Sequence, residues 1–83
     1  MEKIRIRVTS KDIELGVQSK SDSCPIARAI KRKKLGTKIA VGIGDIYIDA
    51  KIKKVSNPER VFRFVNDFDF GSPVEPFSFT LTL

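Results

Sequence analysis

The most constraining feature of this sequence is the strict alternation of apolar and polar residues near both of its ends. Over residues 3–8 the apolar positions are Ile4, Ile6 and Val8, and basic residues occupy the positions between them. Over residues 77–83 phenylalanine or leucine alternates with serine or threonine. Successive side chains of a β-strand point to opposite faces, so this period of two predicts two half-buried strands. The fold therefore contains a sheet with one apolar face.

The middle of the chain predicts a β-hairpin. Isoleucine, valine or alanine recurs at every second position on both sides of a Gly-Asp pair, and the apolar positions are Ile39, Val41, Ile43, Ile46, Ile48, Ala50 and Ile52. A glycine-containing interruption between two alternating runs is typical of a hairpin turn, which we place near residues 42–45.

Three stretches predict helices. Thr9 and Asp12 have the spacing of a capping box, and the one or two turns that follow close at Gly16. A second helix starts at Pro25 and frays near residues 33–34, with Gly36 near its C-cap. A third starts at Pro58. Its apolar face is expected to hold Val61, Phe62, Val65 and Phe68, and Gly71 is expected to end it.

Together these elements predict a single α+β domain over residues 1–83. It has about four mainly antiparallel strands, with two main helices packed on one face. The prolines at 73 and 76 are expected to confine the start of the final strand to an edge or an exposed approach. A chain of this length buries only about 60% of its unfolded surface. This thin core, together with an exposed terminal strand, predicts a homo-oligomer.

The composition points to a soluble protein of the cytoplasm. No apolar run approaches the roughly 20 residues of a membrane span, and the first residues lack the apolar core of a signal peptide. The one cysteine allows no internal disulfide, which fits a reducing compartment.

Positive charge is concentrated in the middle of the chain. The formal net charge is +6, and residues 28–54 contain nine basic residues against two acidic ones. Such a region suits nucleic acid, nucleotides or another anionic partner, although a solvated charged face gives the same count.

The residue types argue against an enzyme. The chain has no histidine and a single cysteine, which removes a zinc site, a Ser-His-Asp triad and a Cys-His dyad from the monomer. Asp67, Asp69 and Glu75 lack the spacing of a calcium loop, so no metal and no cofactor are expected.

The start of the second helix is the candidate site. Ser23 or Cys24 stands where an N-cap belongs, and free backbone N–H groups at such an end suit an anion. The alternative is a well-capped structural helix, in which Cys24 is a small capping residue and not a reactive thiol. The expected ligand-binding residues are Ser21, Ser23, Cys24, Pro25, Arg28, Lys31, Arg32 and Tyr47.

Three motifs together resemble a family of short, uncharacterised phage and prophage proteins. They are T-x-x-D-I-x-x-G from Thr9, C-P-I-A-x-A-I from Cys24, and F-D-x-G-x-P-V-x-P-F-x-F from Phe68. Relatives carry a C-x-x-C-P form, and Ser21 stands here in place of the first cysteine. The resemblance implies a phage setting, in which small basic proteins bind host nucleic acid, inhibit a host protein or sequester nucleotide immune signals.

Three functions remain open at this point. The first is non-catalytic capture of a small phosphorylated ligand, such as a nucleotide-derived defence signal, as a counter-defence sponge. The alternatives are a basic nucleic-acid-binding protein and a protein inhibitor of a host factor. All six phenylalanines follow Arg60 and only Tyr47 lies within the basic segment, which disfavours single-strand binding and leaves duplex binding open.

Overall fold

The computed structural model describes residues 2–42 and 45–83, which form five strands and three helices. In chain order the elements are β1 (Lys3–Val8), α1 (Ser10–Leu15), α2 (Pro25–Arg32), β2 (Ile39–Val41), β3 (Ile46–Ile48), β4 (Lys51–Val55), α3 (Pro58–Asp69) and β5 (Phe77–Thr82). The predicted α+β class is confirmed, and both strands predicted from the terminal alternation are present. Ile43 and Gly44, which belong to the predicted hairpin, lie outside the described residues.

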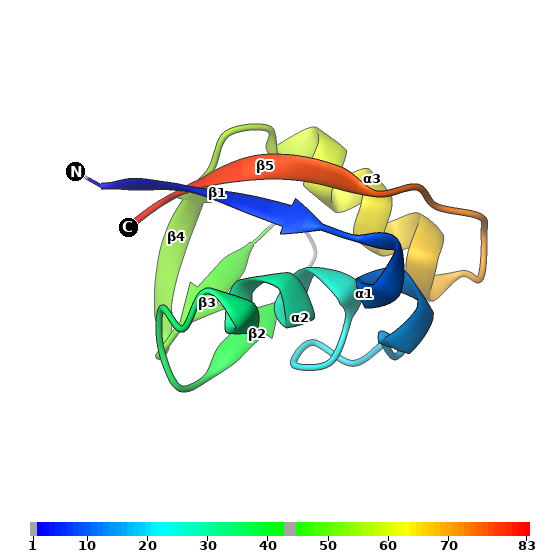
Figure 1. The fold of residues 1–83 in the computed structure, drawn as a ribbon, viewed down its shortest axis with the longest axis horizontal. Helices are drawn as coiled ribbons and strands as arrows, with labels where there is room; N and C mark the ends of the chain where they lie inside the picture. Colours follow the sequence, from blue (N-terminus) through cyan, green and yellow to red (C-terminus); the bar gives the residue numbers. More distant parts are fainter. Residues whose placement is uncertain (1, 43–44) are drawn as a thin grey trace.

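All five strands form one antiparallel sheet in the order β1-β5-β4-β3-β2. The final strand as a whole is not an edge, because β5 lies between β1 and β4 (Figure 1), but its start is one, as expected from the prolines. Only its last two residues pair on both sides: Leu81 and Thr82 face β4 as well as β1, whereas Phe77 pairs with β1 alone. The paired end of β5 removes part of the edge on which the homo-oligomer was predicted, and oligomerisation stays a prediction.

The sheet has one strand more than expected because a tight turn divides the second half of the hairpin. Asp49 and Ala50 both have positive φ, 51° and 68°, and they join β3 directly to β4. The Asp49 carboxylate accepts hydrogen bonds from the backbone N–H groups of Thr37 and Lys38, at 2.9 and 2.8 Å. These bonds fix the turn against the segment that leads into β2.

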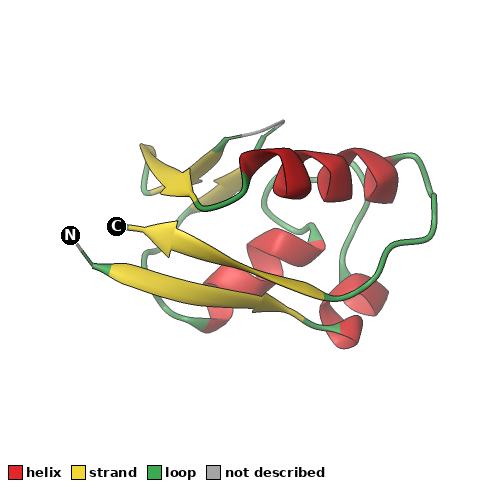
Figure 2. Ribbon diagram, turned by 90° about the horizontal axis from the view of Figure 1, so that it is seen from above, coloured by secondary structure: helices red, strands yellow, loops and turns green. Residues whose placement is uncertain are grey.

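The sheet curls strongly around the core. In Figure 1, β1 and β5 run side by side along the top, β4 descends, and β3 and β2 lie below. In the view of Figure 2, α3 is seen on one side of β1 and β5, and α1 and α2 are seen on the other. Because the sheet curls, these helices reach its inner face from different directions. Helix α2 packs against β1 and β2, and Phe64 of α3 lies 4.8 Å from Phe77 of β5 between ring centroids. Both main helices thus cover one face, as predicted.

The helix boundaries follow from local signals. The predicted capping box is present: the Thr9 hydroxyl accepts from Asp12 N–H, and the Asp12 carboxylate accepts from Thr9 N–H. Gly16 is the C-cap of α1, and a larger residue would not fit there because its Cβ would lie 2.6 Å from the Pro25 ring. Helix α2 has its C-cap at Lys33 and not at Gly36, and Lys34 takes a left-handed conformation.

Helix α3 buries the expected face except at one position, because Val61, Val65 and Phe68 contact the core and Phe62 does not. Phe64 is buried with Val61 and Val65, whereas Phe62 is 42% exposed. Gly71 follows the C-cap with φ of 79°, as its predicted role at the helix end requires. Within the described part of the chain, no helix has both the length and the apolar character needed to cross a membrane.

Candidate nucleic-acid interface

The start of α2 is closed by its own residues. Cys24 is the N-cap, and its Sγ accepts a hydrogen bond from Ala27 N–H at 3.4 Å. Cys24 is only 5% exposed and Pro25 is buried, so the first turn faces the protein interior. The first N–H groups of this helix are therefore poorly placed to meet an anion from solvent.

The Cys24 thiol has the properties of a structural residue. Burial raises its pKa, and the negative charge of Asp69 acts in the same direction, against hydrogen bonds from the N–H groups of Ala27 and Ile26. A raised pKa keeps the thiol protonated, and the thiolate is the reactive form. The interpretation of Cys24 as a capping residue is confirmed.

The polar residues before α2 hold the loop together. Ser23 Oγ donates to the Asp22 carboxylate at 3.2 Å, and Lys31 Nζ donates to the Asp22 carbonyl. Ser21 is exposed, and its carbonyl accepts from Val41 N–H at 2.9 Å. A hollow of about 250 Å³ beside Ser21 and Cys24 is lined by Lys20 and Asp69, whose opposite charges give it no excess of positive charge for a phosphate.

The two arginines of α2 are directed to Asp12. Arg32 donates from Nη1 and Nη2 to the two Asp12 carboxylate oxygens, both at 2.8 Å, and from Nη2 to the Arg7 carbonyl at 2.8 Å. Arg28 Nε lies 3.6 Å from Asp12 Oδ1. Asp12 is fully buried: burial acts to raise its pKa, but the hydrogen bonds from Arg32 and Thr9 outweigh this and hold the pKa below its ordinary value. Arg32 therefore joins α2 to α1 and β1, and Arg28 adds a longer ion pair with the same carboxylate.

The eight predicted ligand-binding residues do not meet in one place. Those before and at the start of α2 surround the buried cap, and Arg28 and Arg32 face Asp12. Tyr47 lies on the opposite face of the sheet, because its neighbours Ile46 and Ile48 point into the core.

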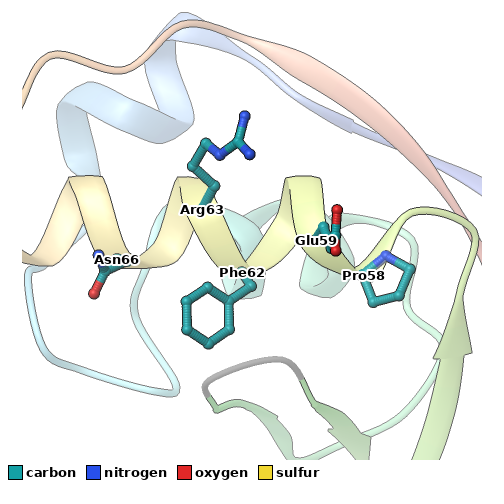
Figure 3. Close-up of a pocket in the computed structure, with 5 residues that line it drawn as sticks. All are labelled: Pro58, Glu59, Phe62, Arg63 and Asn66. Carbon is teal, nitrogen blue, oxygen red and sulfur yellow. The ribbon is translucent and has the colours of Figure 1, made fainter.

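A second hollow, of about 600 Å³, lies along α3. It is lined by Pro58, Glu59, Phe62, Arg63 and Asn66 (Figure 3). All five come from one helix, and Figure 3 shows the Arg63 side chain directed away from Phe62. Polar groups that diverge in this way do not define a small-ligand site, which needs a few convergent groups.

The outer face of the sheet presents a different arrangement. We use this name for the outward positions of the five strands, which are Lys3, Arg5, Arg7, Ala40, Tyr47, Ile52, Lys54, Ser78, Thr80 and Thr82. Four of these side chains are basic, four carry hydroxyl groups and none is acidic. The face is therefore electropositive and rich in hydrogen-bond donors.

Strand order brings these basic residues together from distant parts of the sequence. Thr82 pairs with Lys3 on one side and with Lys54 on the other, and Arg5 pairs with Thr80. Neighbouring strands lie about 4.8 Å apart, so the backbones of Lys3 and Lys54 are about 10 Å apart across β5. Among the residues that the structure describes, the ion pairs involve Asp12 with Arg28 or Arg32, and none includes a cation of the outer face. These cations are free to meet phosphates.

Ala40, Tyr47 and Ile52 form an apolar part of the outer face over β2, β3 and β4, which we call the apolar shelf. Tyr47 pairs with Ile52 on one side and with the small Ala40 on the other. Tyr47 is 36% exposed and Ile52 is 60% exposed. Lys54 follows Ile52 on the same face of β4, so the shelf adjoins the cations.

The sequence alone does not predict that the cations of β1 and β4 share one face, although it predicts that the cations of residues 3–8 point outward. The alternation over residues 3–8 placed Lys3, Arg5 and Arg7 outward, but the basic segment was sought in residues 28–54. Only the order of strands shows that β1 and β4 flank the same strand, and order is a long-range property that alternation does not encode.

Compared with models of protein families, with curated proteins and with solved structures, the chain has no match.

Proposed function

We propose that this protein is a non-catalytic nucleic-acid-binding protein that contacts phosphates through the outer face. The observation that supports this best is the register that places Lys3 and Lys54 on both sides of Thr82, with Arg5 beside Thr80. Basic side chains free of ion pairs favour a polyanion, because they lose no internal partner when they bind a phosphate.

Capture of a small phosphorylated ligand at α2 has less support. Of the groups that this function needs, Arg32 makes three hydrogen bonds inside the protein and the first turn of the helix is buried. Recruiting Arg32 to a ligand would leave Asp12 as a buried carboxylate without its main partner. The sponge role, the inhibitor role and the phage setting stay predictions.

The test compares two variants that lose the same charge. The outer-face variant combines Lys3→Ala, Arg5→Ala and Lys54→Ala. The matched control variant combines Lys11→Ala, Lys20→Ala and Lys33→Ala, all of which are exposed side chains away from the outer face.

Binding is measured by fluorescence anisotropy with a labelled 20-nucleotide DNA, single-stranded or duplex, at 100 mM salt. We expect the outer-face variant to bind about tenfold more weakly, since three exposed charge contacts of about 0.5 kcal/mol each, the middle of the usual range, correspond to roughly this loss. The control variant is expected to stay within about threefold of the wild type. Equal losses in both variants would mean that net charge alone attracts DNA, and this would contradict the proposal.

A further inference from the structure

The shape of the outer face distinguishes between forms of nucleic acid. The sheet curls around the core and both main helices lie on its inner side, so the outer face is convex (Figures 1 and 2). A duplex is stiff, with a persistence length of about 150 base pairs, and it touches a convex surface over a short length only. A single strand is flexible and follows the curvature.

The composition of the face also favours a single strand, against the expectation from the sequence, because the strand register places Tyr47 and Ile52 beside the cations of other strands. Ile52 is 60% exposed beside the exposed Tyr47, so the face offers apolar surface next to its cations. The faces of unpaired bases are apolar and stack on aromatic side chains, whereas a duplex hides them between base pairs. Ala40 leaves one side of Tyr47 uncrowded, and Ile52 extends the apolar surface on the other side.

We infer that the outer face binds a single-stranded polynucleotide, with one base stacked on Tyr47 against Ile52 and the adjoining phosphates on Lys54 and Lys3. This inference rests on the proposed function and adds the polymer class and the base platform. The strand crosses the sheet from β3 over β4 and β5 to β1, since this is the path along which the shelf and the cations follow one another.

The fluorescence of Tyr47 reports directly on stacking. The chain has one tyrosine and no tryptophan, so its intrinsic emission near 300 nm, a general property of tyrosine, comes from Tyr47. A base stacked on the ring is expected to quench this emission, whereas a phosphate contact made elsewhere on the face is not.

The ligands that separate base contacts from phosphate contacts share one length. They are a 12-nucleotide thymidine oligomer, an abasic oligomer with the same sugar-phosphate backbone, a duplex of the thymidine oligomer with its complement, and a uridine oligomer. We expect the wild type to bind the thymidine oligomer about five- to 100-fold more tightly than the abasic one, which is the range for stacking one base. Quenching is expected with the thymidine oligomer and not with the abasic one. The uridine oligomer, which has 2′-hydroxyl groups and lacks the thymine methyl groups, compares RNA with DNA. Tight binding of either single strand that carries bases supports the inference.

Variants at Tyr47 test the platform. Threonine is favoured in strands but has no ring, so the Tyr47→Thr variant should keep the strand and lose the stacking surface. We expect this variant to bind the thymidine and abasic oligomers equally. Tyr47→Phe keeps the ring, and we expect it to retain most of the preference. Phe62→Ala removes an exposed ring on α3, and we expect it to change nothing in binding.

Each way of failing has a separate meaning. If the wild type binds the thymidine and abasic oligomers with equal affinity, the inference is overturned and the proposed function stands. The same holds if the duplex binds more tightly than the single strand and Tyr47→Thr has no effect. If none of the four ligands binds, both the inference and the proposed function are overturned.

Discussion

Arg32 and Asp12 form a two-pronged ion pair in which both carboxylate oxygens accept a hydrogen bond of 2.8 Å from the same guanidinium group. Asp12 also belongs to the capping box of Thr9. One buried carboxylate therefore caps the N-terminus of α1 and holds α2 through Arg32. A charged group taken out of water in this way is retained only where its partners are complete. This pair therefore accounts for the orientation of the arginine side chain that the sequence suggested for ligand binding.

Replacing Asp12 is expected to destabilise the fold. Asp12→Asn keeps the size of the side chain but removes the charge that Arg32 requires, and we expect the free energy of unfolding to fall by about 2 kcal/mol. Breaking a fully buried pair costs about 3–5 kcal/mol, and the loss is smaller here because Arg32 is half exposed. Urea unfolding followed by circular dichroism measures it. Asp22→Asn, an exposed change, is the control and should stay within about 0.5 kcal/mol of the wild type.

The same carboxylate predicts how stability depends on pH. Burial acts to raise the pKa of Asp12, but the hydrogen bonds from Arg32 and Thr9 prevail and lower it in the folded state. The unfolded state therefore binds more protons as pH falls, so the contribution of Asp12 is complete above the unfolded pKa of about 3.9 and is lost as pH falls through the lower folded pKa. We expect melting temperatures between pH 7 and 5 to show no loss from this group, and a decline below about pH 4. A decline of equal steepness in Asp12→Asn would contradict this assignment.

Sequence predicted most of the fold where the signal was local. The capping box at Thr9, the proline at the start of α2 and the alternation of residues 3–8 each act within one element, and each gave the element that the structure has. The pattern predicted the buried face of α3 except at Phe62, which is exposed; Phe64 is buried because it packs against Phe77, a contact that the helical period does not encode.

The candidate site was harder to predict because it depends on partners far apart in the sequence. Arg32 has a basic side chain at an accessible helical position, and nothing local shows that Asp12, twenty residues earlier, neutralises it. Lys3 and Lys54 likewise become neighbours only through β5. Composition found the positive charge and could not locate the surface that carries it.

The turn between β3 and β4 offers a stabilising substitution. Ala50 has φ of 68°, a left-handed conformation that costs an alanine about 1 kcal/mol and costs a glycine little. Ala50→Gly also creates an Asp-Gly pair, which two-residue hairpins favour. After allowing for the greater freedom of glycine in the unfolded chain, we expect a gain of about 0.5 kcal/mol, measured by urea unfolding. A loss of stability would mean that the alanine methyl group makes a contact that outweighs its strain.

Cys24 is expected to react slowly in the native protein. Burial raises the pKa of its thiol and its Sγ already accepts from Ala27 N–H, so little accessible thiolate is present at pH 7. A thiol-specific disulfide reagent should label native protein far more slowly than protein in denaturant, at a rate that follows unfolding. Cys24→Ser retains a capping atom and should remain folded. Rapid labelling of the native protein would show that the start of α2 is open, and would restore it as a candidate site.

The dependence of binding on salt tests which charges meet phosphates. Each phosphate neutralised on a single strand releases counterions, so the slope of log K against log salt concentration is about −0.7 for each contact. Removing Lys3, Arg5 and Lys54 together should make the slope shallower by about 2, because up to three contacts disappear. The matched control variant should keep the wild-type slope, since its three lysines lie away from the outer face. Measurements with the single-stranded oligomer between 50 and 200 mM salt give both slopes. Parallel lines for all three proteins would show that the outer face does not touch the backbone, and a nearly flat wild-type slope would favour a site for one small phosphorylated molecule instead.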